Sequence, residues 1–145
     1  MGCSRVVVTA GATIALGFAG ASAAGAASTT AQPYVTLPSV LVTNVGQHPQ
    51  LVGQYGNRGG TTLNNVTFEC HVVSPVGGAI SPDLSLVSGP FRNPFMPGQN
   101  ANFQYVGTAL RAGVDGVQCT VSGVEAGTNI PRTAVSNVAT IQVNR

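Results

Sequence analysis

Short runs in which apolar and polar residues alternate recur along most of the chain, and this period of two predicts β-strands. The clearest run extends from Asn65 to Val73, where Val66, Phe68, Cys70 and Val72 share one face and the residues between them share the other. Beyond the N-terminal part, no helical period of 3.6 persists over ten residues. The pattern therefore predicts an all-β protein.

Seven such runs are separated by clusters of glycine, proline and asparagine. They are Val35 to Thr43, Leu51 to Gly56, Asn65 to Val73, Leu84 to Ser88, Ala101 to Gly107, Val117 to Val124, and Asn137 to Val143. Pro38 lies inside the first run and marks a break or an edge position, because proline cannot donate a ladder hydrogen bond. About seven short strands with turns between them are typical of an antiparallel β-sandwich.

The N-terminal part has a different character. Arg5 is its one charged residue, an apolar run begins at Val6, and a tract of glycine, alanine and serine follows. This layout is typical of a secretory signal peptide, which we place at residues 1–26. Small residues allow cleavage after Ala23, Ala26 or Ala31. The alternative is a retained membrane anchor, since the weakly polar stretch is nearly long enough to span a bilayer.

Removal of the leader leaves one domain, residues 32–145, and we expect it to be secreted or held in the cell envelope. Its five arginines oppose four acidic residues, and the chain contains no lysine. Such sparse charge gives no electrostatic footprint for nucleic acid or for an anionic membrane. We expect a partner that is a protein or a cell-envelope component, and no membrane-spanning segment in the mature form.

Three cysteines are present, and Cys3 leaves with the leader. Cys70 and Cys119 both fall on the apolar faces of predicted strands, which in an oxidising compartment indicates a disulfide. The alternative is a reactive thiol, because Glu69 and His71 flank Cys70. Adjacent side chains of a strand project to opposite faces, so His71 cannot act as the base for Cys70.

Three segments in order resemble a known repeat: "YGNRGGTTLNNVTF" (Tyr55 to Phe68), "MPGQNANFQY" (Met96 to Tyr105) and "SNVATIQVN" (Ser136 to Asn144). They are similar to the Ig-like repeat of bacterial surface and exported proteins, of the DUF11 type and related to the adhesion-associated CARDB domain. The matching elements are Asn57 and Gly59, Leu63 to Val66, Pro97 to Gln99, and Asn137 to Thr140.

This resemblance implies a seven-stranded Ig-like sandwich that serves as a spacer or adhesion module, with no catalytic residues. The chain departs from the repeat in two ways. It carries one copy instead of a tandem array, and it has a cysteine pair that the repeat does not require.

The sequence offers few groups for catalysis or metal binding. Its histidines are His48 and His71, and no HxH, HExxH, CxxC or GxSxG pattern occurs. We therefore predict no cofactor, no metal and no enzyme activity. A hydrolase would need one of the two histidines within reach of a serine and an acid.

The most suggestive surface feature is the loop Gly89 to Gly98. Phe91, Arg92, Phe95 and Met96 give it the composition of a binding patch. The alternative is that its apolar residues cap one open end of the sandwich. The sequence thus predicts a non-enzymatic, adhesion-type binding or structural module, with a carrier of small hydrophobic ligands as the second hypothesis.

Overall fold

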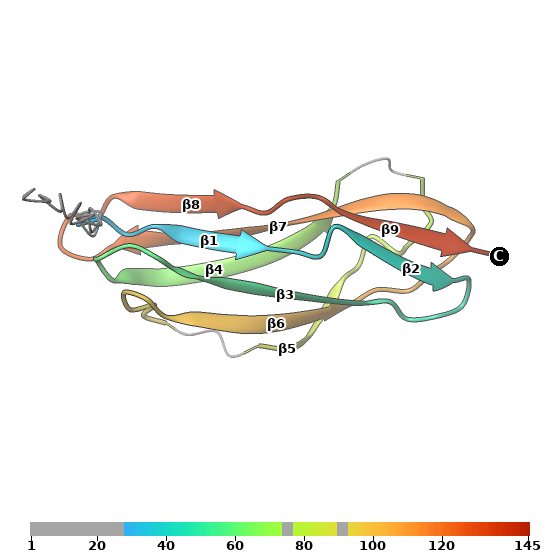
Figure 1. The fold of residues 1–145 in the computed structure, drawn as a ribbon, viewed down its shortest axis with the longest axis horizontal. Coiled ribbons are helices and arrows are strands. Elements are labelled where there is room, and N and C mark those ends of the chain that lie inside the picture. The colour runs from blue at the N-terminus through green and yellow to red at the C-terminus, as the bar shows by residue number, and fades with distance from the viewer. Residues whose placement is uncertain (1–27, 74–76, 90–92) are drawn as a thin grey trace, which may run out of the picture.

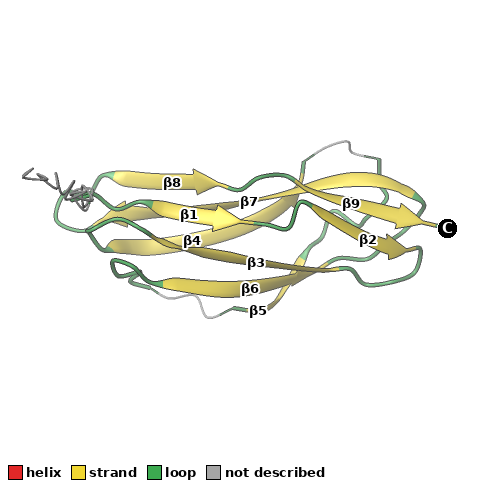
Figure 2. Cartoon of the chain, viewed as in Figure 1, coloured by secondary structure: helices red, strands yellow, loops and turns green. Residues whose placement is uncertain are grey.

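The computed structural model describes residues 28–73, 77–89 and 93–145 of the chain. Within these ranges it consists of strands, turns and loops without a helix (Figure 2). The strands are β1 (Pro33–Thr36), β2 (Val40–Asn44), β3 (Gln50–Asn57), β4 (Leu63–Val72), β5 (Ser85–Ser88), β6 (Asn100–Val106), β7 (Gly113–Glu125), β8 (Pro131–Val135) and β9 (Ala139–Asn144). The predicted signal peptide lies outside the described residues.

The strands form two sheets that pack as a sandwich, elongated along the strand direction (Figure 1). Sheet A has the order β1-β3-β6-β5, and sheet B has the order β2-β9-β7-β4, with β8 also paired to β7. All pairs are antiparallel except β2 with β9, which run parallel. The predicted all-β sandwich is confirmed, with one parallel pair that the sequence did not predict.

The sequence predicts about seven strands, whereas the described residues contain nine. The first predicted run is two strands, β1 in sheet A and β2 in sheet B, and the break falls at Pro38 as expected. β8 was missed because its five residues, Pro131–Val135, include a proline and an arginine and contain no buried residue to produce an alternating pattern.

The segment between β1 and β2 lies beside the segment between β8 and β9. β7 is long enough to pair with β8 along one half and with β9 along the other, so β8 and β9 lie end to end beside it. The residues between them include Asn137, whose side chain hydrogen-bonds to both backbone groups of Leu37 in the break between β1 and β2. The Asn137 amide therefore satisfies both backbone groups of Leu37 at the point where the chain passes from sheet A to sheet B.

Aromatic rings fill the space between the sheets. Tyr55 and Phe103 from sheet A pack on Phe68 from sheet B, with ring centroids 5.0 Å and 4.6 Å apart, and Phe95 and Tyr105 extend the cluster. All five residues are buried. Burial of one such side chain contributes about 2–3 kcal/mol, so this cluster is a main source of stability.

Candidate functional site

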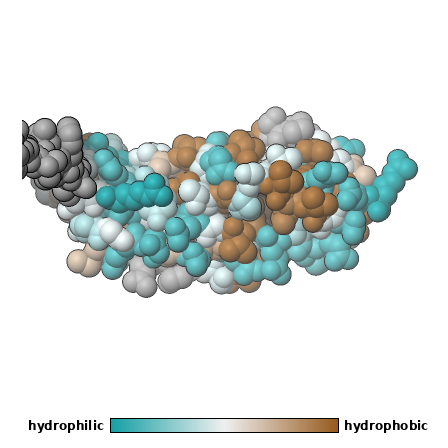
Figure 3. Space-filling model, viewed as in Figure 1, coloured by the Kyte–Doolittle hydropathy of each residue, from teal (hydrophilic) through white to brown (hydrophobic). Residues whose placement is uncertain are grey.

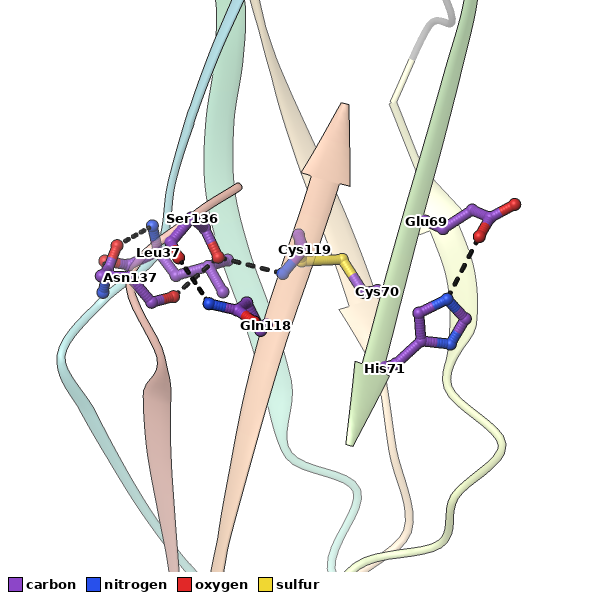
Figure 4. Close-up of a disulfide and its surroundings, with 8 residues drawn as sticks. All are labelled: Leu37, Glu69, Cys70, His71, Gln118, Cys119, Ser136 and Asn137. Atoms are coloured by element: carbon purple, nitrogen blue, oxygen red, sulfur yellow. Dashed lines mark hydrogen bonds and ion pairs between the residues drawn. A yellow bond between two sulfur atoms is a disulfide. The ribbon is translucent and has the colours of Figure 1, made fainter. Parts of the chain in front are cut away.

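The acid, thiol and imidazole at positions 69 to 71 separate onto two faces of β4. Cys70 points into the sandwich and is bonded to Cys119, which pairs with it directly across β4 and β7 (Figure 4). Glu69 and His71 point outward, where the His71 Nε2 and Glu69 Oε2 atoms lie 3.2 Å apart in an exposed pair. The predicted disulfide is confirmed, and the three side chains do not form a reactive centre.

A second group of polar contacts joins β7 at Cys119 to Ser136, which follows β8. The Cys119 amide donates to Ser136 Oγ at 2.9 Å, and the Ser136 amide donates back to the Cys119 carbonyl at 2.8 Å (Figure 4). Gln118 Nε2 donates to the Ser136 carbonyl at 3.0 Å. Ser136 thus continues the ladder of β7 beyond the end of β8, and its hydroxyl has a structural role.

The buried acids are also engaged in structural contacts. Asp115 is fully buried, and its two carboxylate oxygens accept from the amides of Gly77 and Ile80, each at 2.8 Å. Glu125 is 4% exposed, and its Oε2 lies 2.7 Å from Arg132 Nη2. Asp115 therefore holds the loop before β5 against β7, and Glu125 links the end of β7 to β8.

The histidines lie in separate surface positions. His48 Nδ1 is 3.4 Å from the Thr108 hydroxyl, and His71 pairs with Glu69. Among the described residues, neither histidine bonds to a serine, and no group of three or more His, Cys, Asp or Glu side chains is placed to hold a metal ion. The arrangement required for the hydrolase hypothesis is absent from this part of the chain.

Two residues of the loop predicted to bind a partner, Phe95 and Met96, differ in burial. Phe95 is 1% exposed and packs on Tyr55 with ring centroids 5.2 Å apart, so it belongs to the core, as the capping alternative expects. Met96 is 53% exposed and begins a turn in which Gly98 has a φ of 75° and the Gln99 amide donates to the Met96 carbonyl. Pro97 followed by Gly98 is the residue order of a type II turn, in which the glycine position requires a positive φ. Phe91 and Arg92 lie outside the described residues.

The interior offers no room for a ligand in the described part of the molecule. No pocket is found there, and the aromatic cluster occupies the space between the sheets. A filled core is the outcome that argues against the carrier hypothesis.

Burial raises the pKa of the Tyr105 hydroxyl above its ordinary value, and the negative charge of Glu69 adds to the effect.

One surface was not recognised in the sequence. The outward side of sheet A presents hydroxyl and amide side chains, which we call the amide face: Thr36, Gln50, Gln54, Asn100, Asn102 and Gln104. Exposed apolar residues lie over β2, where Val40 and Val42 are each 58% exposed (Figure 3), and also on sheet A, where Val52 is 54% and Val87 is 60% exposed. The signal that could have revealed the amide face is the absence of charge from all strands of sheet A.

Comparison with known proteins bears on the fold. No protein-family model and no curated protein matches the chain. Among solved structures, it is similar to a CARDB domain from Pyrococcus furiosus, solved with di-metal ions, at 15% identity and a TM-score of 0.54 over 81% of this chain and 92% of that one. It is also similar to a human ASH/PapD-like domain of CEP192, at 14% identity and a TM-score of 0.51 over 100% of this chain and 97% of that one.

The chain has an Ig-like fold. A third similar structure is the secreted serine protease VesC from Vibrio cholerae, at 9% identity and a TM-score of 0.50 over 75% of this chain. The chain spans only 23% of that protease, so its activity says nothing about this chain. The Ig-like sandwich implied by the resemblance is thus confirmed, whereas membership of the DUF11 type stays a prediction. In the described ranges, no helix has the length and apolarity needed to cross a bilayer.

Proposed function

We propose that this protein is an exported, non-enzymatic bacterial module of the adhesion type, which acts by binding in the cell envelope or outside the cell. One observation carries the proposal: the buried acids and the sulfurs are held in structural contacts, while one face of sheet A presents hydroxyl and amide side chains to solvent. Groups arranged in this way suit recognition at a surface and do not suit turnover of a substrate.

Export is supported by the disulfide and by the predicted leader. Disulfides persist in oxidising compartments and are rare in the cytosol, where thiols are kept reduced. Cys70 and Cys119 are the two cysteines of the predicted domain, and both are consumed in the bridge. The structural likeness to CARDB and PapD-like domains is compatible with a binding or structural role.

The proposal is tested by expression of the full chain in a bacterial host, with recovery of the mature protein from the culture medium or the envelope. Purified protein is then mixed with cell envelopes and sedimented. We expect a shortened, oxidised chain that co-sediments with the envelopes in a saturable manner. A chain that stays in the cytoplasm, or an oxidised chain that remains in the supernatant at every concentration, contradicts the proposal.

A further inference from the structure

Sheet A stands out by what its strands lack. None of β1, β3, β5 and β6 contains an Asp, Glu, Lys, Arg or His residue, and all four strands are fully described. Natural edge strands commonly carry charges that prevent unwanted pairing. Sheet B has Glu69 and His71 exposed on its edge strand β4 and the half-buried Arg132 on β8, although its other edge strand, β2, is uncharged. Sheet A therefore differs from sheet B in that all of its strands are neutral.

The strand register aligns polar side chains of neighbouring strands in rows across sheet A. Gln54 pairs with Thr36 on one side and with Asn102 on the other, which sets three polar side chains across three strands. Gln104 pairs with Ser88 of β5 in a parallel row. Neighbouring strands lie about 4.8 Å apart, which is comparable to the length of one pyranose unit.

Hydrogen bonds between side chains orient these rows. Tyr34 Oη donates to Gln54 Oε1 at 3.2 Å, and Gln54 Nε2 donates to Asn102 Oδ1 at 3.5 Å. Ser88 Oγ donates to Gln104 Oε1 at 3.5 Å. Each amide keeps at least one further donor or acceptor, because an amide group offers two donors and two lone pairs. The face therefore presents aligned donors and acceptors to an incoming ligand.

Planar groups lie beside the row of Thr36, Gln54 and Asn102, because Tyr34 is paired with Gly56 in the next row of the sheet. A side-chain carbon on Gly56 would lie only 2.6 Å from Cε1 of Tyr34, so the glycine lets the Tyr34 ring lie directly against the backbone of β3. Arg58 stacks on this ring, with its guanidinium carbon 4.0 Å from the ring centroid. The exposed guanidinium adds five N–H donors in one plane beside this row.

We propose that the amide face binds an uncharged polysaccharide, an inference that rests on the proposed envelope function and names its ligand class. Neutral sugars present closely spaced hydroxyl groups, each of which both donates and accepts, and this matches the amide rows. The apolar side of a sugar ring suits Val52, which is 54% exposed on the same face. Among the described residues of this face, an anionic polymer would meet a single arginine, Arg58, and a protein interface would need a larger apolar core than this face offers.

The test is native gel electrophoresis of the oxidised protein in gels that contain dextran, mannan or arabinogalactan. At least one of these should retard the protein, and retardation should be unchanged in about 0.5 M NaCl because no ion pair is involved. The double variant Gln54→Ala/Asn102→Ala should weaken the association at least about tenfold, because two side chains that bond to the sugar are removed.

The matched control is a second bonded pair of amides on sheet B. Gln142 Nε2 donates to Asn144 Oδ1 at 3.2 Å, and both residues are exposed. Gln142→Ala/Asn144→Ala should retain wild-type retardation, and thermal unfolding should show both double variants folded. Absence of retardation by all three polysaccharides, or equal retardation of the two double variants, overturns the inference. If the protein still sediments with envelopes in that case, the proposed function stands without this ligand.

Discussion

Asn137 takes the place of a peptide group beside Leu37, 100 residues earlier in the chain. Its Oδ1 accepts from the Leu37 amide at 3.0 Å, and its Nδ2 donates to the Leu37 carbonyl at 3.1 Å. Leu37 lies where the chain leaves sheet A, and Asn137 lies where the chain passes from β8 to β9. One side chain therefore links the interruption between β1 and β2 to the interruption between β8 and β9.

Replacement of this asparagine tests the role directly. Asn137→Ala removes both hydrogen bonds and should lower the free energy of unfolding by about 1–2 kcal/mol, since water at the exposed position replaces part of what is lost. Urea denaturation measures the change. Asn144→Ala, on the exposed end of β9, should change it by less than about 0.5 kcal/mol. Equal effects of the two variants would show that the Leu37 contact has no special role.

The disulfide should make a large contribution to stability. Cys70 and Cys119 are separated by 49 residues. On the chain-entropy model, closure of a loop of this length stabilises the folded state by roughly 4 kcal/mol. Cys70→Ala/Cys119→Ala should show this loss in urea, and the mass of the untreated protein should rise by about two protons on reduction. Two free thiols in the untreated protein would contradict the bridge.

Phe95 and Met96 are neighbours with opposite roles. Phe95 is buried against Tyr55, so Phe95→Ala should destabilise the domain by about 3–5 kcal/mol, in the range of large core truncations. Met96 is 53% exposed, and Met96→Ala should leave stability within about 0.5 kcal/mol. Thermal and urea unfolding compare the two. A stable Phe95→Ala variant would place this loop outside the core.

Tyr105 should make stability depend on alkaline pH. Its folded-state pKa is raised above 10.0, first by burial and then by Glu69, so the folded state holds the phenolic proton more tightly than the unfolded chain. The contribution is complete below the unfolded pKa and is lost as pH rises through the folded pKa. Stability at about pH 11 should therefore fall more, relative to about pH 9, in the wild type than in Tyr105→Phe. An equal fall in both proteins would assign the effect to other groups.

The strands were predictable wherever one face is buried. In residues 66–71 of β4 and 117–122 of β7, the inward residues include Phe68, Cys70 and Cys119 and the outward ones are polar, so a period of two is visible without any structure. β8 has no buried residue and gave no such signal. The break near Pro38 was visible in the sequence. The contact of this segment with Asn137 was not visible, because no local pattern reveals it.

The site was less predictable than the fold. The disulfide followed from strand alternation and the expected export, because Cys70 and Cys119 both fall on apolar faces of a domain expected in an oxidising compartment. For Phe95 the sequence left two alternatives open, contact with a partner or a cap on the sandwich, because loop composition does not reveal burial. The amide face was missed because Gln54 and Asn102, 48 residues apart, become neighbours only through the register of β3 and β6.

Residue-specific NMR spectroscopy tests most directly the claim that this protein binds through the amide face. Spectra of the ¹⁵N-labelled oxidised protein would be recorded during titration with the polysaccharide that retards it most. We predict that the side-chain amide signals of Gln54, Asn102 and Gln104 shift in a saturable manner, while those of Gln142 and Asn144 stay in place. Shifts confined to sheet B, or no shifts at a saturating concentration, would contradict the account.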